Sequence, residues 1–347
     1  MSDNFPLEQV ARTIGCDSVE FLESIQTLWS GYGEIARVRL HGGKHRDGET
    51  VIVKHVRPPS TLDHKYGWAN DLSHQRKLKS YEIERTFYSK FAARCRPSCP
   101  VPETIASWIN KNAKDELLSL WIAMEDMDAS GFSIRRSAVN ESQLDACLQW
   151  LANFHATFLV DTKVHSTPAC EGLWQTGTYW HLETRPDELN AMPAGPLKQA
   201  AAAIDSRLSQ ARFQTIVHGD AKLANFCFSA NDQVAAVDFQ YVGGGCGMKD
   251  IAYFVSSCFS DRECEKRERE LLDRYFAHLK NAVADSSISR SSFSFADMET
   301  EWRSLYAFAW ADFYRFLAGW SPGHWKMHGY SEQMTGRALA ELPADDQ

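Results

Sequence analysis

The chain has 347 residues, of which 44% are hydrophobic and 12% aromatic, a composition typical of a globular protein that buries sizeable cores. Its formal net charge of −8 argues against a nucleic-acid-binding protein, because such proteins normally carry a basic face. No apolar run reaches the roughly 20 residues that a bilayer-spanning helix needs, so we expect no membrane partner.

The nine cysteines are scattered along the chain and never form a Cys-x-x-Cys pair. Because no signal peptide precedes them, we expect reduced thiols and a cytoplasmic protein. A zinc site made of Cys95, Cys99 and a distant histidine is the alternative use of these residues. The length of the chain suggests about two domains.

The first predicted elements are a short helix and a hairpin. The apolar positions in residues 1–24 predict the helix and the approach to a first strand. Gly31 and Gly33 then precede an extended segment that ends at Leu40, which predicts the hairpin. Glycine lets backbone N–H groups approach phosphate oxygens because no side chain intervenes, so we expect both glycines to contact a phosphate. An ordinary hairpin turn is the alternative.

Lys54 lies within the apolar run of residues 50–56, which predicts a buried strand. A lysine in such a strand is costly unless it is paired or reaches the sheet edge. The alternative is a lysine on an edge strand that faces water. Apolar positions four residues apart predict a helix over residues 80–91, and this helix carries Glu82 and Glu84 as candidate partners for Lys54.

Two further strands are predicted at residues 104–108 and 117–127. The second of them ends where polar residues begin, with Glu125 and Asp126. We place the domain boundary after residue 126.

The chain beyond this boundary is predicted to be mainly helical. Residues 143–159 predict an amphipathic helix with His155 on its apolar face, where we expect a hydrogen-bonded core histidine. The alanine-rich residues 197–211 predict another helix. Asp250 is expected to cap the helix that starts at Ile251.

Residues 301–320 carry an aromatic stripe at helical spacing. Such a stripe is usually part of a core. The alternative is a substrate pocket, because aromatic rings attract cations and pack against apolar ring systems. Asp312 lies among these rings and is a candidate partner for a cationic substrate.

Polar residues gather where the apolar runs at residues 216–217 and 236–237 end; they are His218, Asp220, Lys222, Asn225 and Asp238. Phosphoryl transfer from ATP requires a carboxylate that receives the proton of the attacking hydroxyl, together with an amide and a second carboxylate that hold magnesium. We therefore predict Asp220 as the base, Asn225 and Asp238 as Mg2+ ligands, and Lys222 within reach of the transferring phosphate. The alternative is that each is a turn or cap residue.

The order His-x-Asp-x-Lys-x-x-Asn, followed by Asp-Phe, resembles the catalytic and metal-binding loops of the protein-kinase-like fold. Gly after His, and Gln after Asp-Phe, are similar to the small-molecule branch: aminoglycoside phosphotransferases, choline kinases and, most closely, the ecdysteroid-kinase-like group. The resemblance implies an α+β fold with two lobes. Residues 1–126 would form an antiparallel-sheet lobe that binds ATP, and residues 127–347 a mainly helical catalytic and substrate-binding lobe.

The resemblance also implies roles for residues before the boundary. Lys54 would grip the ATP phosphates, held by Glu84 or, as the fallback, by Glu82. Backbone groups of Met124 and Glu125 would bind adenine. His218 is expected to brace its loop rather than take part in the chemistry.

The implied activity is ATP- and Mg2+-dependent phosphorylation of a hydroxyl on a small molecule. Only eleven residues separate Asp238 from Asp250, and no Ala-Pro-Glu follows, which argues against a protein substrate. A kinase-like module that binds nucleotide without catalysis is the alternative. Bulky apolar alcohols, amino alcohols such as choline and aminoglycosides all remain open as acceptors, and the oligomeric state cannot be read from the sequence.

Overall fold

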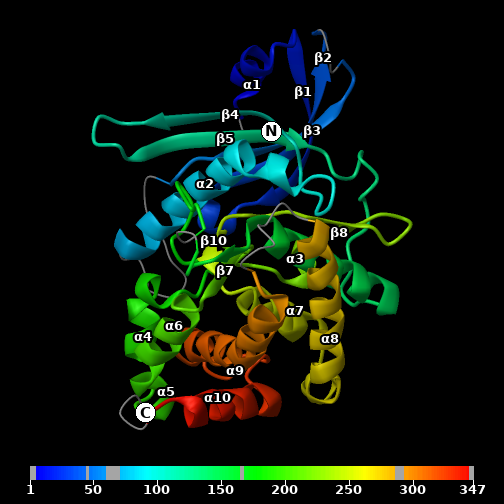
Figure 1. The fold of residues 1–347 in the computed structure, drawn as a ribbon. Coiled ribbons are helices and arrows are strands. Elements are labelled where there is room, and N and C mark those ends of the chain that lie inside the picture. Colours follow the sequence, from blue (N-terminus) through cyan, green and yellow to red (C-terminus); the bar gives the residue numbers. More distant parts are fainter. Residues whose placement is uncertain (1–4, 44–46, 60–70, 165–167, 286–292, 344–347) are drawn as a thin grey trace. The chain divides into compact units, whose positions relative to one another are not determined.

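The structure is a computed structural model that describes residues 5–43, 47–59, 71–164, 168–285 and 293–343. Its tertiary contacts divide the chain into two units (Figure 1). Unit 1 consists of Met1–Arg96 and Val101–Ile134, and unit 2 consists of Pro97–Pro100 and Arg135–Gln347.

Unit 1 is built on a five-stranded antiparallel sheet with the strand order β1-β2-β3-β5-β4. Its strands are β1 (Ser18–Thr27), β2 (Gly33–His41), β3 (Thr50–Val56), β4 (Thr104–Lys111) and β5 (Leu117–Glu125), and its helices are α1 (Leu7–Ile14) and α2 (Asp71–Lys90). The predicted sheet is therefore confirmed, as are the helix that precedes it and the helix within it.

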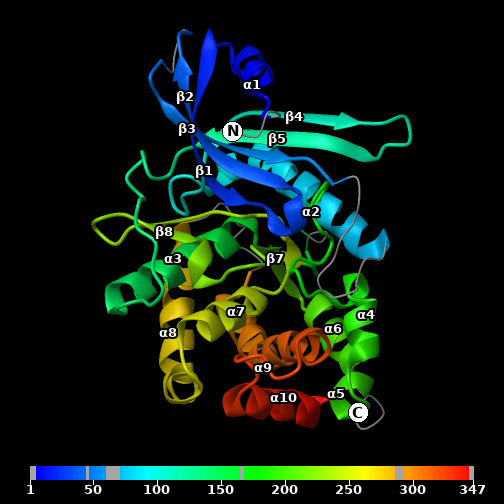
Figure 2. The same cartoon turned by 180° about the vertical axis from the view of Figure 1, so that it is seen from behind.

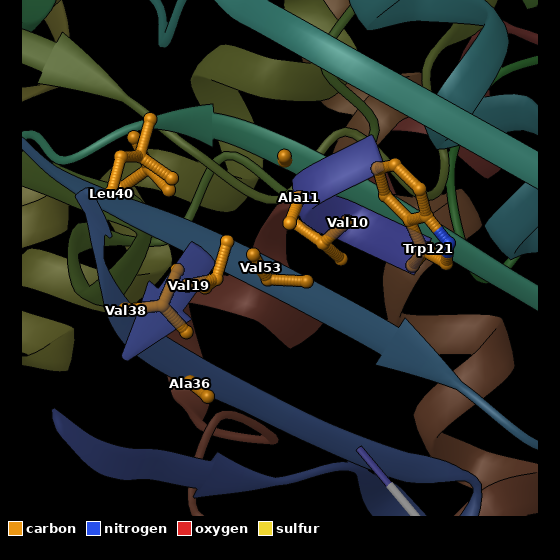
Figure 3. Close-up of a cluster of buried hydrophobic side chains, with 10 residues drawn as sticks. Val10, Ala11, Val19, Ala36, Val38, Leu40, Val53 and Trp121 are labelled. Atoms are coloured by element: carbon orange, nitrogen blue, oxygen red, sulfur yellow. The ribbon is translucent and has the colours of Figure 1, made fainter. Parts of the chain in front are cut away.

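One face of the sheet packs against α1. Alternate residues of β2 are fully buried, as expected for a strand with one face in a core. Val10 and Ala11 of α1 pack with the buried side chains of β2 and β3 and with Trp121 of β5 (Figure 3). Burial of this apolar surface is the main force that holds α1 on the sheet.

The other face of the sheet meets α2. Val53 packs in the cluster around α1, so the next residue of β3, Lys54, points to the opposite face. There its ammonium group meets Glu84 of α2. Ile83 and Phe87 of α2 are fully buried, which matches the predicted spacing of the apolar positions.

Unit 2 is mainly helical and contains two small sheets, one with the order β10-β7-β6 and one formed by β8 and β9. The strands are β6 (Val160–Asp161), β7 (Phe213–Val217), β8 (Phe226–Phe228), β9 (Val234–Ala236) and β10 (Gly243–Gly245). The helices are α3 (Glu141–Phe158), α4 (Pro186–Ala191), α5 (Pro196–Gln199), α6 (Ala201–Ser209), α7 (Met248–Cys258), α8 (Asp261–Asp285), α9 (Phe295–Trp320) and α10 (Gly329–Glu341).

Helix α9 is the centre of the packing in unit 2. It contacts α4, α6, α7 and α10, and α10 lies beside it in both views (Figures 1 and 2). Trp302, Tyr306 and Trp310 are buried to 99% or more, so this part of the aromatic stripe is core. Trp320, at the end of α9, is instead 46% exposed.

A short segment from the first part of the sequence completes unit 2. The carbonyl of Pro100 accepts hydrogen bonds from Trp150 Nε1 at 2.9 Å and from the Ala236 N–H at 3.1 Å. The carbonyl of Ser98 accepts one from Asn153 Nδ2 at 2.7 Å. Residues 97–100 therefore join α3 to the end of β9, although they lie between two parts of unit 1 in sequence.

Two details of the predicted helices are wrong. Helix α7 begins at Met248 with Gly247 as its N-cap, so Asp250 lies in the first turn and is not the cap. The helix predicted at residues 197–211 is two short helices, α5 and α6, which are separated at Ala200. Within the described ranges, no helix combines the length and the apolar character needed to cross a membrane.

Candidate active site

The loop that follows β7 carries His218, Gly219 and Asp220. Gly219 has a φ of +78°, and a Cβ at this position would lie 2.1 Å from the carbonyl oxygen of Tyr241. Only glycine combines this backbone conformation with so close an approach of another chain segment. The turn therefore fixes the direction in which Asp220 leaves the strand.

The Asp250 carboxylate fixes this loop by hydrogen bonds. It accepts hydrogen bonds from the backbone N–H groups of His218 at 2.6 Å and Gly219 at 2.9 Å. The Nε2 atom of His155 lies 3.1 Å from the same carboxylate, and its Nδ1 atom lies 2.8 Å from the Tyr275 hydroxyl. The prediction that His155 is a hydrogen-bonded core histidine is confirmed, and its function is to support Asp250.

His218 is fully buried, and its two ring nitrogens face backbone groups. Nε2 donates to the carbonyl of Val237 at 3.1 Å, and Nδ1 accepts from the Asp220 N–H at 3.3 Å. The Phe239 ring lies 4.5 Å from the imidazole, measured between ring centroids. The imidazole thus joins the Asp220 loop to the segment that carries Asp238.

The Asp220 carboxylate is 95% buried and receives two donors on Oδ2. Lys222 Nζ donates at 2.9 Å and Asn225 Nδ2 at 3.1 Å, and the Asn225 amide also donates to the Asp220 carbonyl at 2.8 Å. The three residues therefore form one hydrogen-bonded set at the end of β7.

The electrostatics of this set are those of a buried carboxylate with one ammonium neighbour. Burial raises the pKa of Asp220, the Lys222 ammonium opposes that rise, and the negative charge of Asp238 adds to it. Burial lowers the pKa of Lys222, but the charge of Asp220, its hydrogen bond and the charge of Asp238 together leave the Lys222 pKa above its ordinary value. A raised carboxylate pKa suits a group that receives a proton.

Asn225 and Asp238 provide oxygen atoms of the kind that Mg2+ binds. Because the Asn225 amide nitrogen is directed at Asp220, the amide oxygen lies on the other side of the group. Asp238 has a φ of +70°, which is uncommon for a residue other than glycine, and its Oδ1 atom accepts from Gln240 Nε2 at 2.6 Å. One amide and one carboxylate fit the octahedral, oxygen-rich coordination that Mg2+ requires with phosphates and water.

In unit 1, the structure brings Lys54 and Glu84 together. The Nζ–Oε2 distance is 2.6 Å, and the side chains are 4% and 2% exposed. Glu82, the other candidate, instead lies 3.0 Å from Lys111 Nζ. Glu84 is therefore the partner of Lys54.

The glycines predicted to contact phosphate, and the residues predicted to contact adenine, differ in how tightly other atoms surround them. Gly33 is required for packing, because a Cβ there would lie 2.0 Å from the carbonyl oxygen of His55, whereas Gly31 has open space around it. Met124 and Glu125 lie at the end of β5. The Glu125 N–H donates to the Glu103 carbonyl at 2.9 Å, so another backbone group of this segment would have to contact adenine.

The side chain of Asp312 is not positioned as a partner for a substrate. It is fully buried, and it accepts from Arg315 Nη2 at 2.7 Å and from Trp180 Nε1 at 3.0 Å. Lys249 Nζ lies 3.5 Å from the same carboxylate. Asp312 therefore neutralises buried cations of the core, which corrects the expectation that it faces a cationic substrate.

Sequence reasoning missed two residues whose pKa the Asp220 charge affects. Tyr253, on α7, lies close enough that the Asp220 charge adds to the effect of burial in raising the pKa of its hydroxyl. Lys326, in the loop after α9, is 93% buried, and the Asp220 charge also acts on its pKa. Neither residue belongs to the motif that identified the site, and no spacing in the sequence connects them to it.

The nine cysteines are all free thiols. In the part of the chain that the structure describes, no group of three or more His, Cys, Asp or Glu side chains is arranged to hold a metal ion. Cys95 and Cys99 are buried in different units, and they form no zinc site with a histidine of the described ranges.

Comparison with known proteins gives a family match over most of the chain. The model of a family described as "Phosphotransferase enzyme family" matches residues 33–285. No curated protein sequence matches the chain.

Solved structures with similar folds include choline kinase from Cryptosporidium parvum Iowa II. It is 11% identical, with 93% of this chain and 88% of that chain covered and a TM-score of 0.48. Macrolide 2'-phosphotransferase from Brachybacterium faecium is 14% identical, with 97% and 98% covered and a TM-score of 0.43. With TM-scores below 0.5 and identities this low, these two likenesses carry no weight for this chain, and the family assignment rests on the family match.

Proposed function

This chain belongs to the phosphotransferase enzyme family, and from that premise we propose that it transfers the γ-phosphoryl group of ATP to a hydroxyl of a small molecule. Membership of this family agrees with the resemblance seen in the sequence. It also agrees with the α+β fold, which has an antiparallel sheet followed by a mainly helical part. The observation that carries the proposal is the Asp220 carboxylate, fixed at the end of β7 by Asn225 and Lys222.

In the proposed reaction, Asp220 receives the proton of the acceptor hydroxyl. The acceptor oxygen forms a bond to the γ-phosphorus, the bond between that phosphorus and the bridging oxygen breaks, and its electron pair leaves with ADP. The loop supports this role, because Gly219 and Asp250 fix the backbone of the two residues before Asp220. A fixed base avoids the entropic cost of being oriented during the reaction.

The charged side chains near Asp220 support transfer of the γ-phosphoryl group. Lys222 is 38% exposed at its side chain, so its ammonium can leave Asp220 and stabilise negative charge on the transferring group. Asn225 and Asp238 would hold Mg2+, which neutralises phosphate charge when it is bound. In unit 1, Lys54 is already oriented by Glu84, and we propose that it binds ATP phosphates together with backbone groups at Gly31 and Gly33. Met124 and Glu125 are proposed to contact adenine.

The proposal is tested with Asp220→Asn. ATP binding, measured by calorimetry with Mg2+, should stay within a few-fold of that of the unchanged protein. ADP release in the presence of a panel of alcohols and amino sugars should fall by roughly a hundredfold to ten-thousandfold, because the variant cannot accept the hydroxyl proton.

A matched control is Asp115→Asn. Asp115 is 85% exposed at its side chain and has a φ of +63°, which asparagine also tolerates, so both activity and stability should be unchanged. Equal activity of Asp220→Asn and the unchanged protein would contradict the proposed base. Stabilisation by Mg2+ and ATP with no turnover of any alcohol would favour a nucleotide-binding module without catalysis.

A further inference from the structure

Lys326 is a buried cation of unit 2. It lies in the loop between α9 and α10, and the residue is 7% exposed. Its Nζ atom donates one hydrogen bond, to Ser256 Oγ at 3.2 Å. An ammonium group has three N–H donors, so this single protein acceptor leaves the group incompletely satisfied.

The other buried lysines among the described residues each have a carboxylate partner. Lys54 pairs with Glu84 at 2.6 Å and Lys249 with Asp312 at 3.5 Å. For Lys326, no carboxylate of the described residues lies within ion-pair distance. Buried charges in proteins are normally paired, because removing an ion from water costs several kcal/mol. A bound anion would therefore supply the counter-charge that Lys326 lacks at ion-pair distance.

Aromatic rings provide part of the missing stabilisation. The Nζ atom lies 4.3 Å from the centroid of the Tyr253 ring, 5.4 Å from Trp325 and 5.5 Å from Phe313. Each distance is within the range of cation–π attraction. In this arrangement the protein's own ammonium occupies a set of rings of the kind that holds quaternary ammonium groups in other proteins.

Lys326 is electrostatically connected to the candidate base. Burial lowers the pKa of Lys326 to about 8, and the Asp220 carboxylate opposes that change. Tyr253 interacts with both groups. Its ring faces Lys326, and the Asp220 charge raises the pKa of its hydroxyl.

One exposed aromatic ring, that of Trp325, lies beside this cation, and a second, that of Trp320, lies at the end of α9. Trp325 is 65% exposed and Trp320 is 46% exposed. His324 stacks on Trp325 at 5.7 Å between centroids, and Trp320 stacks on Phe316 at 5.5 Å. An exposed ring next to a buried cation matches a ligand that has an apolar ring body and a negatively charged group.

We propose that Lys326 binds an oxyanion of the acceptor, so that the preferred substrate is a hydroxy acid with an apolar ring body. This inference rests on the proposed function, and it selects among the acceptors that the sequence left open. The same ammonium repels positively charged alcohols, so choline and aminoglycosides are poor acceptors. Lys326 is thus a specificity-determining residue of the site that contains Asp220.

The test compares acceptors that differ in charge but share a scaffold. One set is para-(hydroxymethyl)benzoate, para-methylbenzyl alcohol and para-(aminomethyl)benzyl alcohol; the other is cholate, its primary amide and its aminoethyl amide. Choline is added as a small cation. ADP release with saturating Mg2+ and ATP should give a kcat/KM at least about tenfold higher for an anionic member than for the cationic member of its set, which corresponds to about 1.4 kcal/mol.

Three variants separate this role from a structural one. Lys326→Met should raise the KM of the anionic acceptor by roughly tenfold or more, leave the KM of ATP unchanged and improve the use of cationic acceptors. Lys326→Arg should keep the preference for anions. Lys280→Met, at an exposed position of α8, should behave like the unchanged protein.

Equal charge preference in Lys326→Met and the unchanged protein would overturn the assignment, as would a preference of the unchanged protein for the cationic members. Turnover that ignores acceptor charge leaves the proposed function intact and removes only the role of Lys326. Binding of ATP and Mg2+ without turnover of any member also overturns that role. Absence of ATP binding would count against the proposed function itself.

Discussion

Lys54 and Lys326 are two buried lysines whose charges are balanced in different ways. In unit 1, Lys54 has a carboxylate partner, Glu84, and both side chains are almost inaccessible to water. In unit 2, Lys326 has one hydroxyl acceptor and three aromatic neighbours. A lysine that is already paired is oriented before a ligand arrives, whereas a lysine without an ion partner is stabilised by the ligand that brings one.

The largest expected effect comes from removing the partner of Lys54. Glu84→Gln removes the carboxylate charge that lies 2.6 Å from a buried ammonium, and we expect the free energy of unfolding to fall by about 3–5 kcal/mol. Urea denaturation measures this loss. Glu82→Gln is the matched control on the same helix, because Glu82 forms a partly exposed pair with Lys111 and should cost less than about 1 kcal/mol. Equal losses in the two variants would show that the buried Lys54–Glu84 pair contributes no more to the free energy of unfolding than the partly exposed pair does.

Asp250 is an intermediate case, since hydrogen-bond donors rather than a lysine satisfy its buried charge. Asp250→Asn replaces one acceptor oxygen with an NH2 group that cannot accept from the His218 or Gly219 N–H. We expect a loss of about 2–3 kcal/mol in unfolding free energy and a lower turnover, because the Asp220 loop loses its support. Asp145→Asn, at a half-exposed contact with His278, is the control and should leave both quantities unchanged. Intact turnover in Asp250→Asn would show that the loop keeps its geometry without this carboxylate.

The smallest expected effect is a pH dependence due to Lys326. Burial lowers its pKa from the ordinary 10.5 to about 8, the charges of Asp220, Cys258 and Cys264 oppose that change, and Lys222 adds to it. Between these two values the unfolded chain binds a proton that the folded protein does not, so stability rises with pH. Relative to Lys326→Met, the unchanged protein should gain about 2 kcal/mol between pH 8 and pH 10. Parallel stability curves for the two proteins would mean that Lys326 is not destabilised by burial, and the contrast with Lys54 would disappear.

The sequence predicted those parts of the candidate site whose residues lie close together along the chain. His218, Asp220, Lys222 and Asn225 occupy one loop, so their spacing already places them together. Alternation along β3 directs Lys54 to the face opposite the α1 cluster, and only one of the two candidate glutamates of α2 reaches it. The predicted sheet and helices followed from periodicity in the same way.

Residues that act through distant contacts could not be predicted in this way. Asp250 resembled a helix cap, because its true donors, the His218 and Gly219 N–H groups, lie more than thirty positions earlier in the chain. Asp312 resembled a substrate contact, because the sequence does not show that Arg315 and Lys249 neutralise it. Lys326 belongs to a loop without any motif, and only packing brings it to Tyr253.

The four residues from Pro97 to Pro100 limit how this polypeptide can be divided. They belong to unit 2, although the ribosome makes them before the last strands of unit 1. During synthesis, the carbonyl groups of Ser98 and Pro100 cannot form these hydrogen bonds until Trp150, Asn153 and Ala236 have left the ribosome. A fragment that starts at position 135 would contain most of unit 2 without the acceptors for those three donors.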